Sequence, residues 1–406
     1  MSATPLQNNN ATITTAQQMA DDTIARMRRF LVNTDAETAL HEPCFQANEW
    51  QYIKQCLDSG WVSSAGNFVD AFENNLAQYT QVDHAIAMVN GTSALHTCLL
   101  ALGIDYHCEV LLPALSFVAT ANAISYTGAT PHFVDVSLTS LCVDPEKLND
   151  YLAEIGRIRN GTLFNKYSGK PIKALVAVNT FGHPIEIDAL LEICERYHLY
   201  LVEDAAESLG SYYGDHHSGS RSMISALSFN GNKIITTGGG GAVITNNSEL
   251  AKYTRHISTT ARTPGWRFDH DRVAFNYRLP NINAALGLAQ LEDMQWHLNH
   301  KRQLALHYLQ AFADCSYGRI FQEAEFATSN YWLNILILQK PDSELLQGII
   351  QAMNAQGYMV RPCWRLLNEL PMYQEYPGMD LSNAETLADS IVCLPSSAQL
   401  DITKNG

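Results

Sequence analysis

The chain carries LVED at Leu201–Asp204 and SFNGNK at Ser228–Lys233, followed by two isoleucines, two threonines and the glycine run Gly238–Gly241. The first stretch reads as an apolar strand that ends in acids, and the second places a lysine shortly before glycines that permit close backbone approach. A carboxylate, a primary amine and such an approach are what an enzyme needs to hold pyridoxal phosphate as an electron sink. We therefore expect Lys233 to carry this cofactor and Asp204 to tune its ring.

Each of these residues also has an ordinary interpretation. An aspartate at a strand end, such as Asp204, commonly caps the following helix, and a loop lysine is usually a solvated charge. The apolar neighbours Phe229 and Ile234 favour the neutral amine that a nucleophilic Lys233 requires. Glu207 falls on the same helical face as Asp204, so it reaches either the cofactor hydroxyl or a solvent-facing partner.

Other segments offer partners for the same cofactor. Gly91, Thr92 and Ser93 form a turn at a helix start, where free backbone N–H groups and the helix dipole favour an anion such as phosphate. Ordinary helix capping uses the same geometry, so both interpretations stay open. Ser228 is a second candidate phosphate ligand, and Phe117 either joins the core or stacks on the cofactor ring.

Composition and charge restrict the class of protein. The chain has 406 residues, of which 46% are apolar and 17% charged, as is typical of globular proteins, and this length predicts two packed domains. The net charge of −15 disfavours nucleic acid and anionic membranes as partners. The nine cysteines are scattered without a C-x-x-C pair, which favours reduced thiols and no metal site. No apolar run approaches the length of a membrane span, and the N-terminus lacks an apolar signal core, so we expect a cytoplasmic protein.

The spacing of apolar residues predicts an α/β fold. Strand-like segments alternate with helix-like ones, the strands at 84–89, 109–112, 130–135, 174–179 and 199–203 and the helices at 94–102, 117–127, 147–152 and 185–197. Such alternation predicts a mostly parallel sheet with its ligand at the carboxyl ends of the strands.

The pattern changes near Leu279. One long helix, straight or kinked, is expected at 281–312, and a smaller α+β domain follows it. We therefore divide the chain into a polar tail and helix at 1–39, a large domain at 40–280 and a small domain at 281–406. Much of the stretch up to about Gln18 is polar, and we expect it to be disordered or loosely docked.

These segments together resemble the DegT/DnrJ/EryC1/StrS family of pyridoxal-phosphate-dependent nucleotide-sugar aminotransferases. The resemblance begins near Leu40 and rests on ordered motifs, namely GWVSS at 60–64, GTSAL at 91–95, TFGHP at 180–184, EDAAE at 203–207, SFNGNK at 228–233, NYR at 276–278 and NINAA at 281–285. The chain departs from the family at Gly239, where many members carry Glu.

The resemblance implies a type I, aspartate aminotransferase-like fold with a mostly parallel seven-stranded sheet and a smaller C-terminal domain. It implies a homodimer in which both subunits build each active site. Lys233 would form the Schiff base with pyridoxal phosphate, Asp204 would pair with the pyridine nitrogen, and Glu207 would lie near the cofactor hydroxyl. The remaining implied contacts are stacking by Phe117 and phosphate binding by Thr92, Ser93, Ser228 and, from the neighbouring subunit, Asn276.

A finer resemblance is to the branch that makes 4-amino-4,6-dideoxy-N-acetyl sugars for legionaminic acid or bacillosamine. It rests on SFNGNK with its glycines, YWLN at 331–334, RPCW at 361–364, LPMY at 370–373 and LPSS at 394–397. It implies amino transfer from L-glutamate to the C4 ketone of a UDP-linked 2-acetamido-4-keto-6-deoxy sugar, for surface glycan or nonulosonic acid biosynthesis. His183, Arg361 and Trp364 are candidate substrate contacts, although packing in the small domain explains Arg361 and Trp364 equally well.

Two other functions stay open. A GDP- or dTDP-sugar 3- or 4-aminotransferase would share the same motifs, and a non-catalytic pyridoxal-phosphate-binding regulator would keep the site without turnover. The acidic charge and the lack of a DNA-binding appendage disfavour the regulator. A dehydratase of the same superfamily is disfavoured by Lys233, because those enzymes characteristically have histidine at that position.

Overall fold

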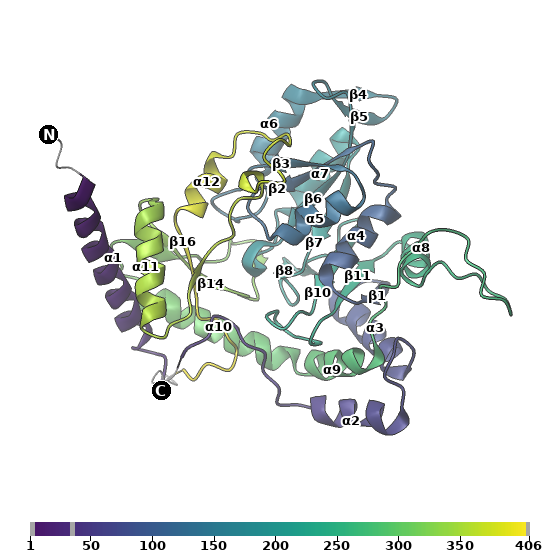
Figure 1. Cartoon of the computed structure of the whole chain (residues 1–406), viewed down its shortest axis with the longest axis horizontal. Coiled ribbons are helices and arrows are strands. Elements are labelled where there is room, and N and C mark those ends of the chain that lie inside the picture. Colours follow the sequence, from purple (N-terminus) through teal and green to yellow (C-terminus); the bar gives the residue numbers. More distant parts are fainter. Residues whose placement is uncertain (1–4, 33–36, 403–406) are drawn as a thin grey trace.

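The structure, a computed structural model, describes residues 5–32 and 37–402. A mostly parallel sheet forms its centre (Figure 1), with a seven-strand path in the order β1-β11-β10-β7-β6-β2-β3. These strands are β1 (His84–Met88), β2 (Glu109–Pro113), β3 (Thr130–Val134), β6 (Pro171–Val178), β7 (Tyr200–Asp204), β10 (Ile224–Ser228) and β11 (Gly241–Thr245). β11 runs antiparallel to both of its neighbours, whereas β10, β7, β6, β2 and β3 are parallel. The predicted α/β class and mostly parallel sheet are confirmed, and seven strands form its main path.

A hairpin that the sequence pattern did not predict extends this sheet. β4 (Gly156–Arg159) pairs with β5 (Thr162–Asn165), and β5 pairs with β6 in the antiparallel sense. The hairpin brings the sheet to nine strands. It lies at the opposite end of β6 from the site described below, since the pairing involves the start of β6.

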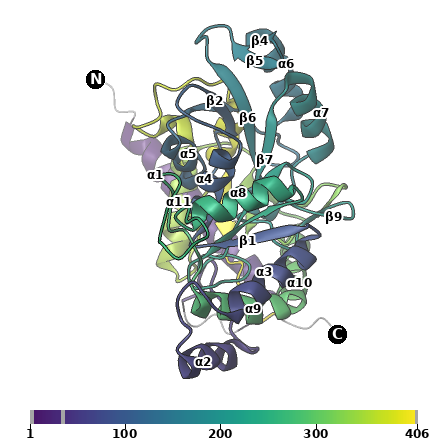
Figure 2. The same ribbon diagram turned by 90° about the vertical axis from the view of Figure 1, so that its right-hand side faces the viewer.

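Helices cover both faces of the sheet, as Figure 2 shows. α4 (Gly91–Ala101) and α5 (Val118–Tyr126) pack with Val110, Leu112 and Val176 on one face. α6 (Pro145–Ile155) and α7 (Ile187–Tyr197) pack with the alternate residues Leu111 and Leu175 on the other. Because successive strand residues point to opposite faces, strands covered on both sides must be apolar throughout, and β2 is buried along its whole length.

A third layer packs on the β1–β11 edge. It contains α2 (Glu49–Ser59), α3 (Asn67–Thr80) and α9 (Asn281–Glu292), while α8 (Ser248–Ser258) contacts β1 and β11 from another side. Phe72 and Leu288 belong to the same buried cluster as Ala85 of β1 and Ile244 of β11. α9 therefore shares its core with the large sheet, although it follows the expected domain boundary at 280/281.

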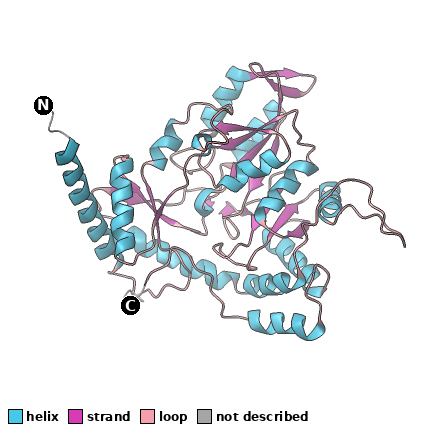
Figure 3. Ribbon diagram, in the orientation of Figure 1, coloured by secondary structure: helices cyan, strands magenta, loops and turns pink. Residues whose placement is uncertain are grey.

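The C-terminal part forms a second core around a four-stranded sheet of order β12-β14-β16-β15. Its elements are α10 (Met294–Ala311), β12 (Gly318–Ile320), β14 (Asn334–Leu338), α11 (Ser343–Ala355), β15 (Arg361–Pro362), the 3-10 turn η2 (Leu367–Glu369), α12 (Ser382–Ala388) and β16 (Ile391–Leu394). Three short strands, β8 (Tyr212–Tyr213), β9 (His216–His217) and β13 (Ala327–Thr328), form a third sheet, and η1 (Thr180–Gly182) is a further 3-10 turn. Figure 3 shows this part as helices packed beside a small sheet, in agreement with the expected α+β character.

One expectation about helices needs correction. From Pro5 onward the polar N-terminal stretch is part of α1 (Pro5–Met27), which packs against α11, with Ala16, Ala20 and Ile24 in the second core, and residues 1–4 lie outside the described residues. Small and apolar residues on one face explain why a polar helix docks there. The expected helix at 281–312 is present in its kinked form, as α9 and α10 with a break at Asp293. Within the described residues, no helix has both the length and the apolar character that crossing a membrane requires.

Candidate active site

A cavity of about 720 Å³ lies where β7 and β10 end. The large sheet contributes Asp204 and Ser228, the last residues of these two strands. The small domain contributes Arg361 and Trp364 to the same lining. This placement agrees with the rule that ligands of parallel sheets bind at the carboxyl ends of the strands.

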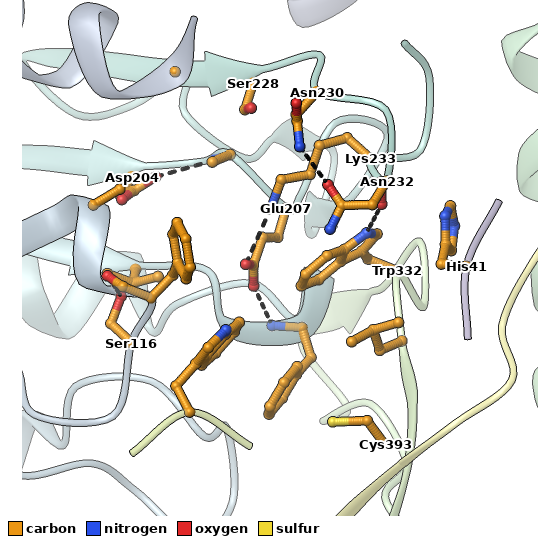
Figure 4. Close-up of a pocket in the computed structure, with 18 of the residues that line it drawn as sticks. His41, Ser116, Asp204, Glu207, Ser228, Asn230, Asn232, Lys233, Trp332 and Cys393 are labelled. Atoms are coloured by element: carbon orange, nitrogen blue, oxygen red, sulfur yellow. Dashed lines mark hydrogen bonds and ion pairs between the residues drawn. The ribbon is translucent and has the colours of Figure 1, made fainter. Parts of the chain in front are cut away.

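Lys233 extends into this cavity from the loop after β10, and Figure 4 shows it between Asp204 on one side and Trp332 and His41 on the other. Its Nζ lies 3.3 Å from Glu207 Oε1 and 4.0 Å from the centre of the Trp332 ring. The Trp332 indole is held in turn by donating a 2.6 Å hydrogen bond to the carbonyl of Asn232. The amine is therefore held by a carboxylate and an aromatic face, as a cation–π contact allows.

Glu207 connects Lys233 to a second strand end. Its Oε2 accepts a 2.9 Å hydrogen bond from the backbone N–H of Phe181, which lies in the turn after β6. Phe181 itself has a positive φ of 57°, so the turn is unusual for a non-glycine residue. The Glu207 carboxylate therefore both orients the Lys233 amine and stabilises the turn at Phe181.

Asp204 is buried and hydrogen-bonded on both oxygens. Oδ2 accepts a 2.8 Å hydrogen bond from the Thr120 hydroxyl, and Oδ1 accepts a 3.3 Å bond from the backbone N–H of Ala206. Burial raises the pKa of Asp204, and the bonds from Thr120 and Ala206 and the charge of Lys233 oppose that rise. Burial also raises the pKa of Glu207, against the charge of Lys233. Two buried carboxylates therefore share one nearby cation.

The start of α4 faces the same cavity. Gly91 and Thr92 line it, whereas the backbone N–H of Ser93 is already bonded to the Asn90 side chain at 2.7 Å. Asn90 is thus the helix cap, and the N–H groups of the first two helical residues remain available to an anion. Ser93 is buried and does not line the cavity.

Close packing of three backbones explains the glycines around this turn. A Cβ on Gly91 would lie 2.8 Å from Cβ of Ser228, and one on Gly241 would lie 2.6 Å from the backbone carbon of Asn90. Both distances are too short for real side chains, so β10, β11 and the start of α4 can meet only through glycine. The predicted glycine-dependent approach is present at these two positions.

Aromatic rings form one wall of the cavity. Trp364 stacks on Phe181 with ring centroids 5.0 Å apart, and it lies 6.4 Å from both Phe117 and Trp332. Phe117 is half exposed, which leaves one side of its ring open to a ligand. Arg361 and Trp364 thus line the cavity, rather than serving only to pack the small domain.

Besides Ser93, the structure leaves two further predicted residues outside this cavity. His183 is buried between Phe321 and Tyr331, at ring distances of 4.7 Å and 5.4 Å. Asn276 is exposed on the segment that pairs with Thr259, away from the cavity lining. An exposed Asn276 agrees with the expectation that it serves a neighbouring subunit, which stays a prediction.

Several lining residues were not predicted as site residues from the sequence, among them His41, Asn90, Thr120, Phe181 and Trp332. Thr120 lies within an apolar helix pattern, and nothing local marks its hydroxyl as a partner of Asp204. Asn90 carries the one usable signal, since an asparagine just before Gly91 is a strong helix cap. His41 lines the cavity, and its two buried ring nitrogens have no partner among the described residues.

The residues present fit pyridoxal phosphate. The cavity offers an amine at Lys233, a buried carboxylate at Asp204, an aromatic face at Phe117 and free N–H groups at Gly91 and Thr92. These match the aldehyde, pyridine nitrogen, ring and phosphate of the cofactor. In the part of the chain that the structure describes, no three His, Cys, Asp or Glu side chains are grouped as metal ligands.

Comparison with known proteins gives the same assignment. The model of the DegT/DnrJ/EryC1/StrS aminotransferase family matches residues 43–404. The GDP-perosamine synthase of Caulobacter vibrioides is 35% identical over 360 residues, which cover 88% of this chain and 92% of that protein. The GDP-perosamine synthase of Escherichia coli O157:H7 is 36% identical, with 83% and 87% covered.

A solved structure extends the similarity to three dimensions. Helicobacter pylori PseC, an aminotransferase involved in the biosynthesis of pseudoaminic acid, matches with a TM-score of 0.80 at 26% identity. The match covers 90% of this chain and 95% of PseC. Together with the family match, it confirms the expected type I transferase fold.

Proposed function

Because the chain belongs to the DegT/DnrJ/EryC1/StrS aminotransferase family, we propose that it moves the amino group of L-glutamate to the C4 ketone of a nucleotide-linked 4-keto-6-deoxy sugar. Like its relatives, it is a pyridoxal-phosphate-dependent sugar aminotransferase. One observation carries the proposal. Lys233 and Asp204 share a cavity with Arg361 and Trp364, so cofactor-binding groups and candidate sugar-nucleotide contacts face one space.

Pyridoxal phosphate supplies an electron sink for the bond changes at the amino-bearing carbon. Lys233 would hold the cofactor through Nζ and, as a free amine, would move the proton between the cofactor carbon and the sugar C4. Glu207 orients that amine, and Asp204 holds a proton on the pyridine nitrogen. Gly91, Thr92 and Ser228 bind the phosphate, Phe117 covers the ring, and the aromatic wall excludes water from the reacting atoms.

We propose a GDP-linked sugar as the first candidate acceptor, supported by the identity of 35% and 36% to two GDP-perosamine synthases. The UDP-linked 2-acetamido sugar is the second candidate, supported by the RPCW segment at 361–364, whose Arg361 and Trp364 line the cavity. Homodimer assembly and a cytoplasmic location are further proposals.

A half-reaction assay separates these candidates. The protein is loaded with pyridoxal phosphate, converted to the pyridoxamine form with glutamate, freed of glutamate and then mixed with GDP-, UDP- or dTDP-linked 4-keto-6-deoxy sugars. The proposal predicts that a GDP sugar restores the pyridoxal absorbance faster than its UDP counterpart. Faster restoration by the UDP-2-acetamido sugar would replace the first candidate with the second. Failure of glutamate to convert the cofactor would contradict the proposed donor.

A further inference from the structure

Thr120 and Ser116 form a hydrogen-bonded pair behind the Asp204 carboxylate. Thr120 lies in the first turn of α5, and Ser116 lies just before that helix. Their hydroxyl oxygens are 3.0 Å apart, and the Thr120 oxygen is 2.8 Å from Asp204 Oδ2. Both residues are 1% exposed and line the active-site cavity (Figure 4 labels Ser116 and Asp204).

The direction of the hydrogen bonds follows from the number of protons. Each hydroxyl has one hydrogen, and an ionised carboxylate accepts only. Thr120 must therefore give its hydrogen to Asp204, and its oxygen then accepts the hydrogen of Ser116. The sequence Ser116 to Thr120 to Asp204 is fully satisfied when Asp204 carries a negative charge.

The surroundings of Asp204 make this bond important. Lys233 is the cation that acts on it, while Glu207 adds a second carboxylate and Cys98 of α4 a buried thiol. Lys233 also changes its bonding when it binds and releases the cofactor. The bonds from Thr120 and the Ala206 N–H are therefore the support for the Asp204 charge that does not depend on the state of Lys233.

We propose that Thr120, oriented by Ser116, is a positioning residue that keeps the Asp204 carboxylate ionised and directed toward the pyridine nitrogen of the cofactor. The pair also flanks Phe117, the residue proposed to cover the cofactor ring. The start of α5 therefore positions both Phe117, which covers the cofactor ring, and Asp204, which pairs with the ring nitrogen. This inference rests on the proposed role of Asp204.

Ring-nitrogen protonation provides a direct test. Pyridoxal phosphate labelled with ¹⁵N in the ring is bound to the wild type, Thr120→Val, Thr120→Ser and Ser116→Ala, and the ¹⁵N shift is followed while the pH is raised. The wild type and Thr120→Ser should keep the protonated shift, whereas Thr120→Val should move toward the unprotonated value at lower pH. Cofactor affinity of Thr120→Val should fall about tenfold or more, as expected for a lost hydrogen bond to a charged group.

Matched controls separate the alternatives. Thr80→Val removes an equally buried hydroxyl that bonds only to its own helix, and it should leave the ¹⁵N titration unchanged. A Thr120→Val titration identical to the wild type overturns the inference when Asp204→Asn does shift the titration. If Asp204→Asn has no effect either, the proposed role of Asp204 falls as well. Should Thr120→Val not fold, Ser116→Ala must show a smaller shift in the same direction, and an unshifted Ser116→Ala overturns the inference.

Discussion

His183 is a polar side chain in an apolar setting. Its two buried ring nitrogens have no hydrogen-bond partner among the described residues, and the rings of Phe321 and Tyr331 pack edge-on against it. Burial lowers the pKa of His183 to about 3. Folding therefore holds this imidazole neutral at pH values where the unfolded chain would protonate it.

The pH dependence of unfolding should show that folding keeps the His183 imidazole neutral. The folded pKa is depressed, so His183 costs stability as pH falls from the unfolded value near 6.5 toward 3. His183→Phe removes that cost, and its free energy of unfolding relative to wild type should rise by about 2 kcal/mol between about pH 7 and about pH 5. Urea denaturation at both pH values measures the difference. A constant difference, combined with a raised KM for the sugar, would favour the substrate-binding role predicted for His183 instead.

At the residue scale, the sequence located the groups that follow strands. Asp204 and Ser228 end strands, and Lys233 follows closely, so strand position alone places them at one edge of a parallel sheet. Thr120 and Trp332 reach the same cavity only through tertiary packing, from α5 and from the small domain. No local pattern reports which hydroxyl or indole will face a carboxylate or amine 84 or 99 residues away.

At the element scale, the glycine run after Lys233 joins β11 to the start of α4. Gly241 is paired with both β1 and β10, and its α-carbon faces the Asn90–Gly91 backbone. Gly239, where the resemblance leads us to expect Glu in many members, has nothing within 4 Å of an added Cβ. The neighbouring backbone therefore excludes a side chain at Gly241, whereas the space around Gly239 would admit one.

Substitution by alanine should distinguish them. Gly241→Ala should lower the free energy of unfolding by about 1–3 kcal/mol, because backbone atoms cannot move away individually. It should also weaken cofactor binding, since the displaced turn carries the proposed phosphate-binding N–H groups. Gly239→Ala, the matched control in the same run, should change stability by less than about 0.5 kcal/mol. Denaturation curves and cofactor titrations check both, and equal losses for the two variants would contradict the close-approach argument.

Two elements show where the sequence pattern is weakest. The β4–β5 hairpin is short and partly exposed, so its apolar alternation is weak. The pattern at 281–312 left a straight or a kinked helix open, and packing decides between them. Met294 and Leu298 of α10 stay in the cluster of α9, whereas the later part of α10 belongs to the second core. Short or interrupted elements depend on their neighbours more than on their own residues.

At the scale of the whole molecule, Asn276, the predicted phosphate contact from a neighbouring subunit, does not line the cavity of its own chain. This residue lies on an exposed segment whose neighbours Trp266, Phe268 and Val273 are also exposed. Exposed apolar residues of this size on one segment are typical of interfaces. A homodimer in which this segment completes the partner's cavity accounts for both facts.

Subunit complementation tests that assembly. Lys233→Ala and Asn276→Ala homodimers should each be inactive or strongly impaired, because every site lacks one group. Co-expressed as heterodimers, they should regain activity, since one of the two sites then combines an intact Lys233 with an intact Asn276. No recovery in a verified heterodimer would contradict a site shared between subunits.

The central claim is that Lys233 Nζ binds pyridoxal phosphate covalently, and borohydride trapping tests it most directly. The loaded protein is reduced with borohydride and digested, and the modified peptide is identified by mass spectrometry. We predict the pyridoxyl group on Lys233 and its loss in Lys233→Ala, with Lys301, the buried lysine that donates to the Trp332 carbonyl, unmodified. A pyridoxyl group on Lys301 or on any other lysine, or none at all, would contradict the account.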